Sequence, residues 1–160
     1  MIQNTKNLLS DFNDAFRNLY RLTLDIEYES QKAPHQPHIL PDHKCAVYVF
    51  SLSENYGNSC PAGANRVLKV GKVGSNSSPR FQYQHYNYRS AGSNLSKSII
   101  DSKILWPYLG ITELQINHVS NWIKENVDRD HFYLNSGDLS QLDDLELYFK
   151  GRLGPVFEGG

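Results

Sequence analysis

The chain has little cysteine and no long hydrophobic run. No stretch of its 160 residues approaches the roughly 18 consecutive apolar residues that a membrane-spanning helix needs, so we expect no membrane span. The N-terminal sequence MIQNTKNLLSDF lacks the cationic start and the apolar core of a signal peptide. We therefore expect a cytoplasmic protein built around one packed core.

The two cysteines, Cys45 and Cys60, stand alone in the sequence. Neither belongs to a CxxC pair, which argues against a zinc–thiolate site. A disulfide between them is geometrically conceivable, but cytoplasmic proteins rarely keep one. We expect both side chains to be reduced thiols with structural roles.

Positive charge is concentrated in the middle of the chain. The formal net charge is −1, yet the stretch 66–103 carries seven basic residues and a single acid, Asp101. The segments on either side of it are net acidic. This cationic stretch predicts attraction to a polyanion, with an affinity that falls as salt rises. The alternative is a solvated surface whose charges pair with the acidic flanks.

Apolar spacing predicts one long amphipathic helix at the N-terminus, over residues 5–30. Leu9, Phe12 and Phe16 fall at spacings of three and four, and polar residues fill the other side. An apolar stripe of this width must pack on something. It either caps the domain or forms a dimer or partner surface.

Three prolines in the stretch APHQPHILPDH predict an extended linker over residues 33–43. Its histidines are His35, His38 and His43. A metal cluster among them is conceivable, but no carboxylate–histidine spacing supports one. We therefore divide the chain into residues 1–43, a helix and linker packed on the domain, and residues 44–160, the domain itself.

The rest of the chain alternates between strand and helix patterns. β-branched and aromatic residues predict strands over 45–52, 66–71 and 131–135. Turn-forming residues separate the first two strands, which favours an antiparallel pair. Helices are predicted to begin near Pro79, near Asn94 with Ser93 as an alternative cap, from Ile116 to Val127, and at Ser140, with Gly154-Pro155 ending the last one. This order predicts an α+β fold, a small antiparallel sheet flanked by helices.

One stretch, Val67 to Tyr86, combines a short apolar strand, a glycine- and serine-rich turn and a basic, aromatic segment. Cations and hydroxyl groups held together by a tight turn favour phosphate binding. The sequence argues against a nucleotide-binding phosphate loop, because GKVGS lacks the GxxxxGK[ST] spacing. The residues of interest are Lys69, Lys72, Arg80, Tyr83, His85 and Tyr86.

Motifs around this stretch resemble those of the GIY-YIG nucleases, over about residues 45–157. That family has a tyrosine-bearing triplet at the end of one strand, a glycine-bearing triplet on the next, then an arginine and, much later, a helical glutamate. Arg80 comes nine residues after Gly71, and Pro155 comes nine residues after Glu146, a spacing known in the family. The matching positions are Ala46-Val47-Tyr48, Lys69-Val70-Gly71, Lys72, Arg80, Glu146 and Pro155.

The resemblance implies a three-stranded antiparallel sheet flanked by helices and cleavage of DNA with one divalent metal, Mg²⁺ or Mn²⁺. It implies Glu146 as the metal ligand and Arg80 as the group that binds phosphate and offsets transition-state charge. Tyr48 would be the general base for water, with its pKa lowered by Lys72. One metal site cuts one strand, so a duplex cut implies a homodimer, with the helix at 5–30 as the natural contact.

The chain also departs from the family pattern. Lys69 replaces the second tyrosine, Gln84 stands where an aromatic residue or histidine is expected, and Glu158 replaces an asparagine. A shift of one residue would let Tyr83, His85 or Tyr86 take the place of Gln84. The expected DNA contacts outside the catalytic group are Lys69, Arg89 and Lys97. The departures also motivate a second hypothesis, a non-catalytic module on the same fold that binds nucleic acid or a protein partner.

Overall fold

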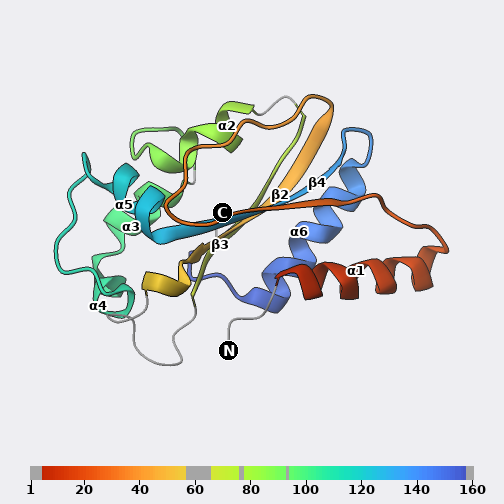
Figure 1. Ribbon diagram of the computed structural model, residues 1–160, viewed down its shortest axis with the longest axis horizontal. Coiled ribbons are helices and arrows are strands. Elements are labelled where there is room, and N and C mark those ends of the chain that lie inside the picture. Colours follow the sequence, from red (N-terminus) through yellow and green to blue (C-terminus); the bar gives the residue numbers. More distant parts are fainter. Residues whose placement is uncertain (1–4, 57–65, 76–77, 93, 158–160) are drawn as a thin grey trace.

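The structure is a computed structural model that describes residues 5–56, 66–75, 78–92 and 94–157. These residues form a four-stranded antiparallel sheet in the order β1-β4-β2-β3 (Figure 1). The strands are β1 (Glu27–Gln31), β2 (Lys44–Leu52), β3 (Val67–Val73) and β4 (Val127–Asn135). The predicted α+β class is confirmed, and the predicted antiparallel pairing of the first two domain strands is also correct.

Helices cover both faces of this sheet (Figure 1). The long helices α1 (Thr5–Tyr20) and α6 (Leu139–Leu153) lie on one face, which we call the α6 face. Short helices lie on the other, which we call the α2 face. They are α2 (Ser78–Gln82), η2 (Gln84–Tyr86), α3 (Leu95–Asp101), η3 (Lys103–Leu105), α4 (Trp106–Leu109) and α5 (Val119–Asn126), with η1 (Glu54–Tyr56) after β2.

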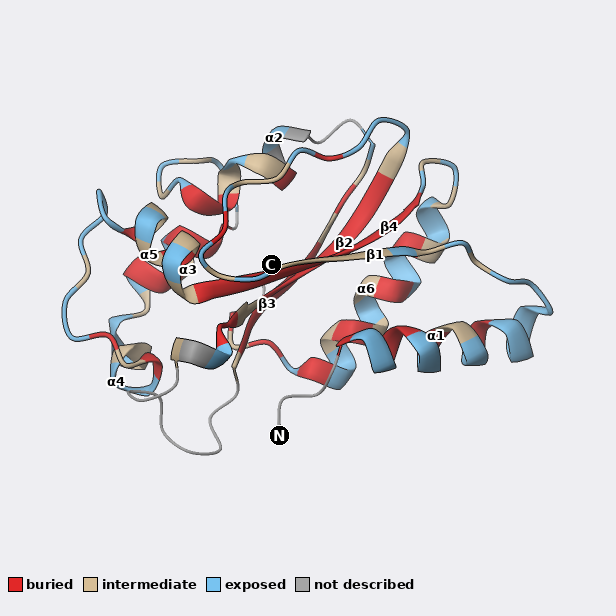
Figure 2. Ribbon diagram, in the orientation of Figure 1, coloured by how far each residue is buried: buried red, intermediate tan, exposed pale blue. Residues whose placement is uncertain are grey.

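Strand β2 contributes to both layers of core because successive side chains of a strand point to opposite faces. Val47 and Val49 pack on the α6 face, whereas Tyr48 and Phe50 pack on the α2 face. Strands β2 and β4 are buried along nearly their whole length (Figure 2). Two-sided burial explains why the sequence of β2 is a continuous apolar run rather than an alternating one.

The prediction of a single helix over 5–30 was wrong in its second half. Helix α1 ends at Tyr20, and Arg21 follows with a left-handed φ of 58°, which a helix does not continue through. Strand β1 then pairs along the edge of β4, so the sheet has four strands instead of three. The apolar stripe of α1 is buried against the sheet and α6, and caps the domain as one of the two interpretations expected.

Several predicted element ends differ from the observed ones. The third predicted strand begins earlier, at Val127, and the helix before it stops at Asn126. Asn94 caps α3 as predicted, because its side chain accepts a hydrogen bond from the Lys97 amide. Ser140 does not cap α6, which begins one residue earlier after Asp138.

The proline-rich segment 33–43 is neither helix nor strand, as predicted, and it runs across the α2 face, where Leu40 joins the core. Within the described ranges, no helix is long and apolar enough to cross a bilayer. Cys45 is a buried free thiol, whereas Cys60 lies outside the described residues.

Candidate functional site

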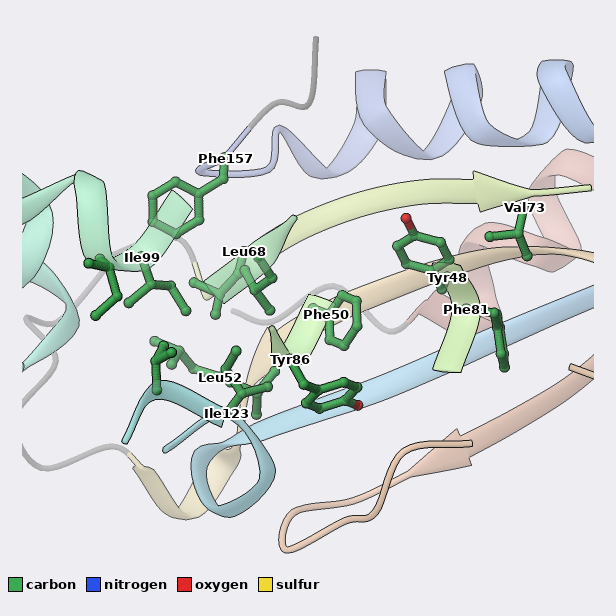
Figure 3. Close-up of a cluster of buried hydrophobic side chains, with 14 of the residues drawn as sticks. Tyr48, Phe50, Leu52, Leu68, Val73, Phe81, Tyr86, Ile99, Ile123 and Phe157 are labelled. Carbon is green, nitrogen blue, oxygen red and sulfur yellow. The ribbon is translucent and has the colours of Figure 1, made fainter. Parts of the chain in front are cut away.

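The two triplets that carry the family resemblance are neighbours across the β2–β3 pair. Tyr48 lies directly opposite Gly71. Its ring crosses over that glycine, so a Cβ built at position 71 would lie 2.3 Å from the Tyr48 hydroxyl oxygen. No side chain fits at that distance. Glycine at position 71 is therefore what allows Tyr48 to lie flat against β3 within the α2-face core (Figure 3).

His85 is the residue that joins Tyr48. Its Nε2 lies 2.6 Å from the Tyr48 hydroxyl, and its Nδ1 accepts a hydrogen bond from the Leu95 amide at 3.1 Å. Because Nδ1 accepts, Nε2 carries the proton and donates it to the Tyr48 oxygen. Tyr83 is 57% exposed, and Tyr86 instead contacts other partners. The choice among the three residues left open by the sequence thus falls on His85 for contact with Tyr48.

A second group of predicted site residues forms on the α6 face. Lys72 Nζ lies 2.5 Å from Asp143 Oδ1 and 3.4 Å from Glu146 Oε2. Lys150 Nζ also contacts Glu146, at 3.0 Å from Oε1. The hydrogen bond to Asp143 and the nearby charge of Glu146 raise the pKa of Lys72 although partial burial opposes them, so Lys72 is cationic. The Glu146 side chain is 14% exposed.

These two groups lie on opposite faces of the sheet, which corrects the expected arrangement. Lys72 pairs with Val47, one position away from the Tyr48–Gly71 pair, and adjacent positions of a strand face opposite ways. The structure therefore does not bring Tyr48 and Lys72 together. Tyr48 is also fully buried, so it has no access to a water held near Glu146. The general-base role that the resemblance implied for Tyr48 is not supported by this geometry.

The remaining predicted residues are spread over the surface and the core. Arg80 lies in α2, but its side chain is outside the described part of the structure. Lys69 is only 2% exposed, opposite Phe50, which corrects its expected role as a surface DNA contact. Arg89 is exposed, as a DNA contact requires. Lys97 pairs with Asp101 at 3.1 Å, so part of the cationic stretch is neutralised locally.

Sequence reasoning missed the buried Arg129 of β4. Its guanidinium donates hydrogen bonds to the Tyr86 hydroxyl at 3.1 Å and to the Phe81 carbonyl oxygen, and lies 4.4 Å from the Phe81 ring centroid. Burial, followed by the charge of Arg129, lowers the pKa of His131 to about 2. Burial is also the main reason that the pKa of His35 falls to about 4. Both imidazoles are therefore neutral near pH 7.

A cluster of Glu29, His38 and His131 lies on the α2 face near the β1 edge. Glu29 and His131 are cross-strand partners in β1 and β4, and His131 is in turn opposite Tyr48 in β2. Glu29 Oε1 lies 3.0 Å from His38 Nε2 and 3.1 Å from His131 Nδ1. The Tyr133 hydroxyl also donates to this oxygen, at 3.0 Å.

The sequence carried only a faint signal of this cluster. His38 belongs to the three linker histidines that the sequence singles out, but its partners come from two strands, of which β4 lies far away in the chain. The stretch Val127–Asn135 places Arg129 and His131 at alternate positions of a strand that is buried on both faces. Charged and imidazole side chains in such a strand need specific partners, and this pattern is the signal that could have been followed.

Comparison with known proteins adds no relative. No protein-family model, no curated protein and no solved structure matches this chain. The likeness to the GIY-YIG nucleases is therefore carried by the residues themselves. Of its six matching positions, the structure pairs Tyr48 with Gly71 and brings Lys72 to Glu146.

Proposed function

We propose that this protein is a metal-dependent DNA endonuclease of the GIY-YIG type, whose hydrolytic site lies at the end of β3 on the α6 face. The observation that carries the proposal is the convergence of two α6 carboxylates, Asp143 and Glu146, on the Lys72 ammonium group. Lys72 is 41% exposed, so a phosphate can reach it. Helix α2, which carries Arg80, begins a few residues after this strand end and contacts β3. It covers the opposite face, so the proposal requires Arg80 to reach the phosphate around the β3 edge of the sheet.

The residues present fit a hard divalent cation. Asp143 and Glu146 already face one cationic group, and oxygen ligands of this kind suit Mg²⁺ or Mn²⁺, which bind proteins through one or two carboxylates plus phosphate and water. When bound there, the metal ion would polarise a phosphoryl oxygen and activate water. Glu146 and Asp143 would hold it, and Lys72 would turn from Glu146 toward the substrate.

The chain's own residues then have distinct tasks. Lys72 is kept cationic by its raised pKa, so it stabilises negative charge on the phosphate rather than accepting a proton. Arg80 binds the phosphate as a bidentate donor, and Arg89 contacts the DNA backbone from the surface. Tyr48 and His85 act as a buried hydrogen-bonded pair that fixes β2, β3 and η2 relative to one another.

A homodimer is part of this proposal, because one metal site cuts one strand. The apolar stripe of α1 is used within the chain, but Leu19 and Leu147 remain 76% and 72% exposed beside a groove between α1 and α6. We infer that two copies meet along this groove. Double-strand linearisation of plasmid, rather than nicking alone, is the expected result.

A specific observation favours the second candidate, a non-catalytic nucleic-acid-binding module. Glu146 is contacted by both Lys72 and Lys150, and these ion pairs oppose metal binding. In this alternative the carboxylate only holds the two lysines in place. DNA would then be bound without being cut.

Incubation of supercoiled plasmid with Mg²⁺ or Mn²⁺ separates the two functions. We expect the wild-type protein to cut, and Glu146→Gln to lower the rate by at least about a hundredfold because the metal loses its ligand. The matched control is Glu125→Gln, an exposed acid of α5 on the other face of the sheet, which should cut like wild type. Urea unfolding of each variant establishes that the fold is retained.

Two results would contradict the nuclease proposal. The first is DNA binding without cleavage with either metal, which leaves the binding module. The second is full cleavage by a folded Glu146→Gln protein, which removes this carboxylate from the site.

A further inference from the structure

We propose that Glu29, His38 and His131 form a second metal site, selective for Zn²⁺ and separate from the proposed hydrolytic site. The three ligand atoms lie within 4.8 Å of one another. The proposed zinc site and the proposed hydrolytic site are on opposite faces of the sheet. His131 and Tyr48 share the α2 face, whereas Glu146 packs on the α6 face. The inference does not depend on the nuclease activity.

Two of the three distances between the ligand atoms are close to those around a bound metal, and the two histidine nitrogens lie within 4.8 Å of each other. Ligands at 2.0–2.1 Å from a tetrahedral Zn²⁺ lie roughly 3.3 Å apart. Glu29 Oε1 is 3.0 Å from His38 Nε2 and 3.1 Å from His131 Nδ1. Small side-chain adjustments therefore suffice to place both nitrogens and one carboxylate oxygen around a common ion.

Hydrogen bonding at Glu29 is crowded in a way that a cation would relieve. Three groups, His38 Nε2, His131 Nδ1 and the Tyr133 hydroxyl, all lie within 3.1 Å of the same oxygen, Oε1. A carboxylate oxygen has about two lone-pair positions for donors. A metal ion bound by the two imidazole nitrogens and the carboxylate oxygen would replace these competing hydrogen bonds with three metal–ligand bonds.

His131 presents one ring nitrogen, Nδ1, to the site from a fixed position. Its side chain is fully buried, and Nε2 has no hydrogen-bond partner among the described residues. Whichever ring nitrogen carries the proton, one nitrogen of this buried imidazole is poorly satisfied, which is costly. Nδ1 is the nitrogen that faces Glu29, and coordination through it leaves the proton on Nε2. The Phe81 ring, with its centroid 4.8 Å away, holds the imidazole in place.

The donor set selects the metal and leaves an entrance. Two imidazoles and one carboxylate suit Zn²⁺, whereas Mg²⁺ prefers oxygen ligands. Glu29 and His38 are 38% and 31% exposed, so the ion can enter from solvent and keep a water as its fourth ligand. Bound there, it would tie the segment 33–43 to β1 and β4.

Calorimetric titration of the full chain, stripped with a chelator, tests the site with Zn²⁺ as the probe. We expect one Zn²⁺ per chain and a higher unfolding temperature. His38→Ala and Glu29→Gln should each weaken zinc binding at least about tenfold and abolish the rise in unfolding temperature. Co²⁺ in place of Zn²⁺ should give the visible absorption of a tetrahedral centre, and Mg²⁺ should not compete.

Two control variants make the result specific. His43→Ala removes an exposed histidine of the same segment and should bind zinc like wild type. Glu146→Gln should also keep its zinc affinity, which separates this site from the proposed nuclease. Metal-free unfolding midpoints show whether His38→Ala and Glu29→Gln remain folded. No zinc uptake by the wild type, or wild-type affinity in folded His38→Ala and Glu29→Gln, would overturn the proposal.

Discussion

Single residues in this protein are constrained by very close contacts across the sheet. Gly71 is an example, because Tyr48 occupies the space where its side chain would be. The glycine of the second triplet is thus explained by packing against the tyrosine of the first, whatever chemistry the chain performs. The hydrogen bond from His85 to Tyr48 completes a unit that joins β2, β3 and η2.

Replacement of Gly71 by alanine is therefore expected to destabilise the fold. A Cβ would lie 2.3 Å from the Tyr48 hydroxyl oxygen and 2.5 Å from its ring, so Tyr48 or β3 must move. Overpacking of this kind costs about 1–3 kcal/mol of unfolding free energy, measured by urea unfolding. Gly74→Ala is the matched control, because a Cβ there meets nothing within 4 Å. Equal stability of the two variants would contradict the close contact.

At the scale of elements, the short helix α3 on the α2 face is stabilised at its N-terminus by a side-chain cap. Asn94 is the residue that caps the start of α3. Its buried side chain accepts hydrogen bonds from the Lys97 amide at 2.8 Å and from the Ser96 hydroxyl at 2.7 Å. The next amide, that of Leu95, donates to His85. The start of α3 therefore positions the imidazole that contacts Tyr48.

Asn94→Ala should remove this cap and lower the unfolding free energy by about 1–2 kcal/mol. Because α3 supports His85, the substitution should also speed up amide exchange in η2, and by a larger factor than in β4. Ser140→Ala provides the comparison, since Ser140 is exposed and does not cap α6. The interpretation fails if Ser140→Ala is as destabilised as Asn94→Ala, or if exchange in η2 is unchanged.

At the scale of the whole molecule, the α2-face core contains neutral histidines beside a buried cation. His35 Nε2 lies 2.6 Å from the Tyr86 hydroxyl, which also receives a hydrogen bond from Arg129. Burial lowers the pKa of His35 to about 4, and the charges of Arg129 and Lys124 act in the same direction. Asp128 and a backbone contact at Val127 oppose the shift without cancelling it.

This arrangement predicts that stability falls in mild acid. Above pH 6.5 His35 is neutral in both states and has no effect, whereas below it the unfolded chain binds a proton that the folded chain does not. His35 alone should therefore lower the unfolding free energy by about 1.4 kcal/mol per pH unit between its unfolded and folded pKa values, roughly 3 kcal/mol in all. His131 adds to this slope, because its pKa is lowered as well.

Urea unfolding between about pH 7 and about pH 4 measures this slope. His35→Gln keeps a neutral polar side chain and should reduce the pH dependence to the part that His131 contributes, although it also lowers stability near pH 7. His118→Gln, at an exposed histidine, should leave the dependence as in wild type. An unchanged slope in His35→Gln would show that His35 is protonated in the folded state.

Much of this molecule could be predicted from local sequence patterns alone. Apolar runs located β2 and β3, a proline located the start of α2, and Asn94 and Gly154 marked helix ends, because each pattern acts through its own backbone neighbourhood. The family resemblance singled out the lysine and the glutamate that meet at 3.4 Å. Local patterns failed after Tyr20, where the apolar periodicity predicted a longer helix than the one that forms.

Only the tertiary structure decided which residues share a face. Adjacent positions of β2 and β3 point to opposite sides, and which helices cover each side depends on the packing of the whole chain. For that reason Tyr48 and Lys72, close in the motif, are separated by the sheet. Glu29 and His38 meet the distant His131 for the same reason, because the pairing of β1 with β4 and the path of 33–43 bring them together.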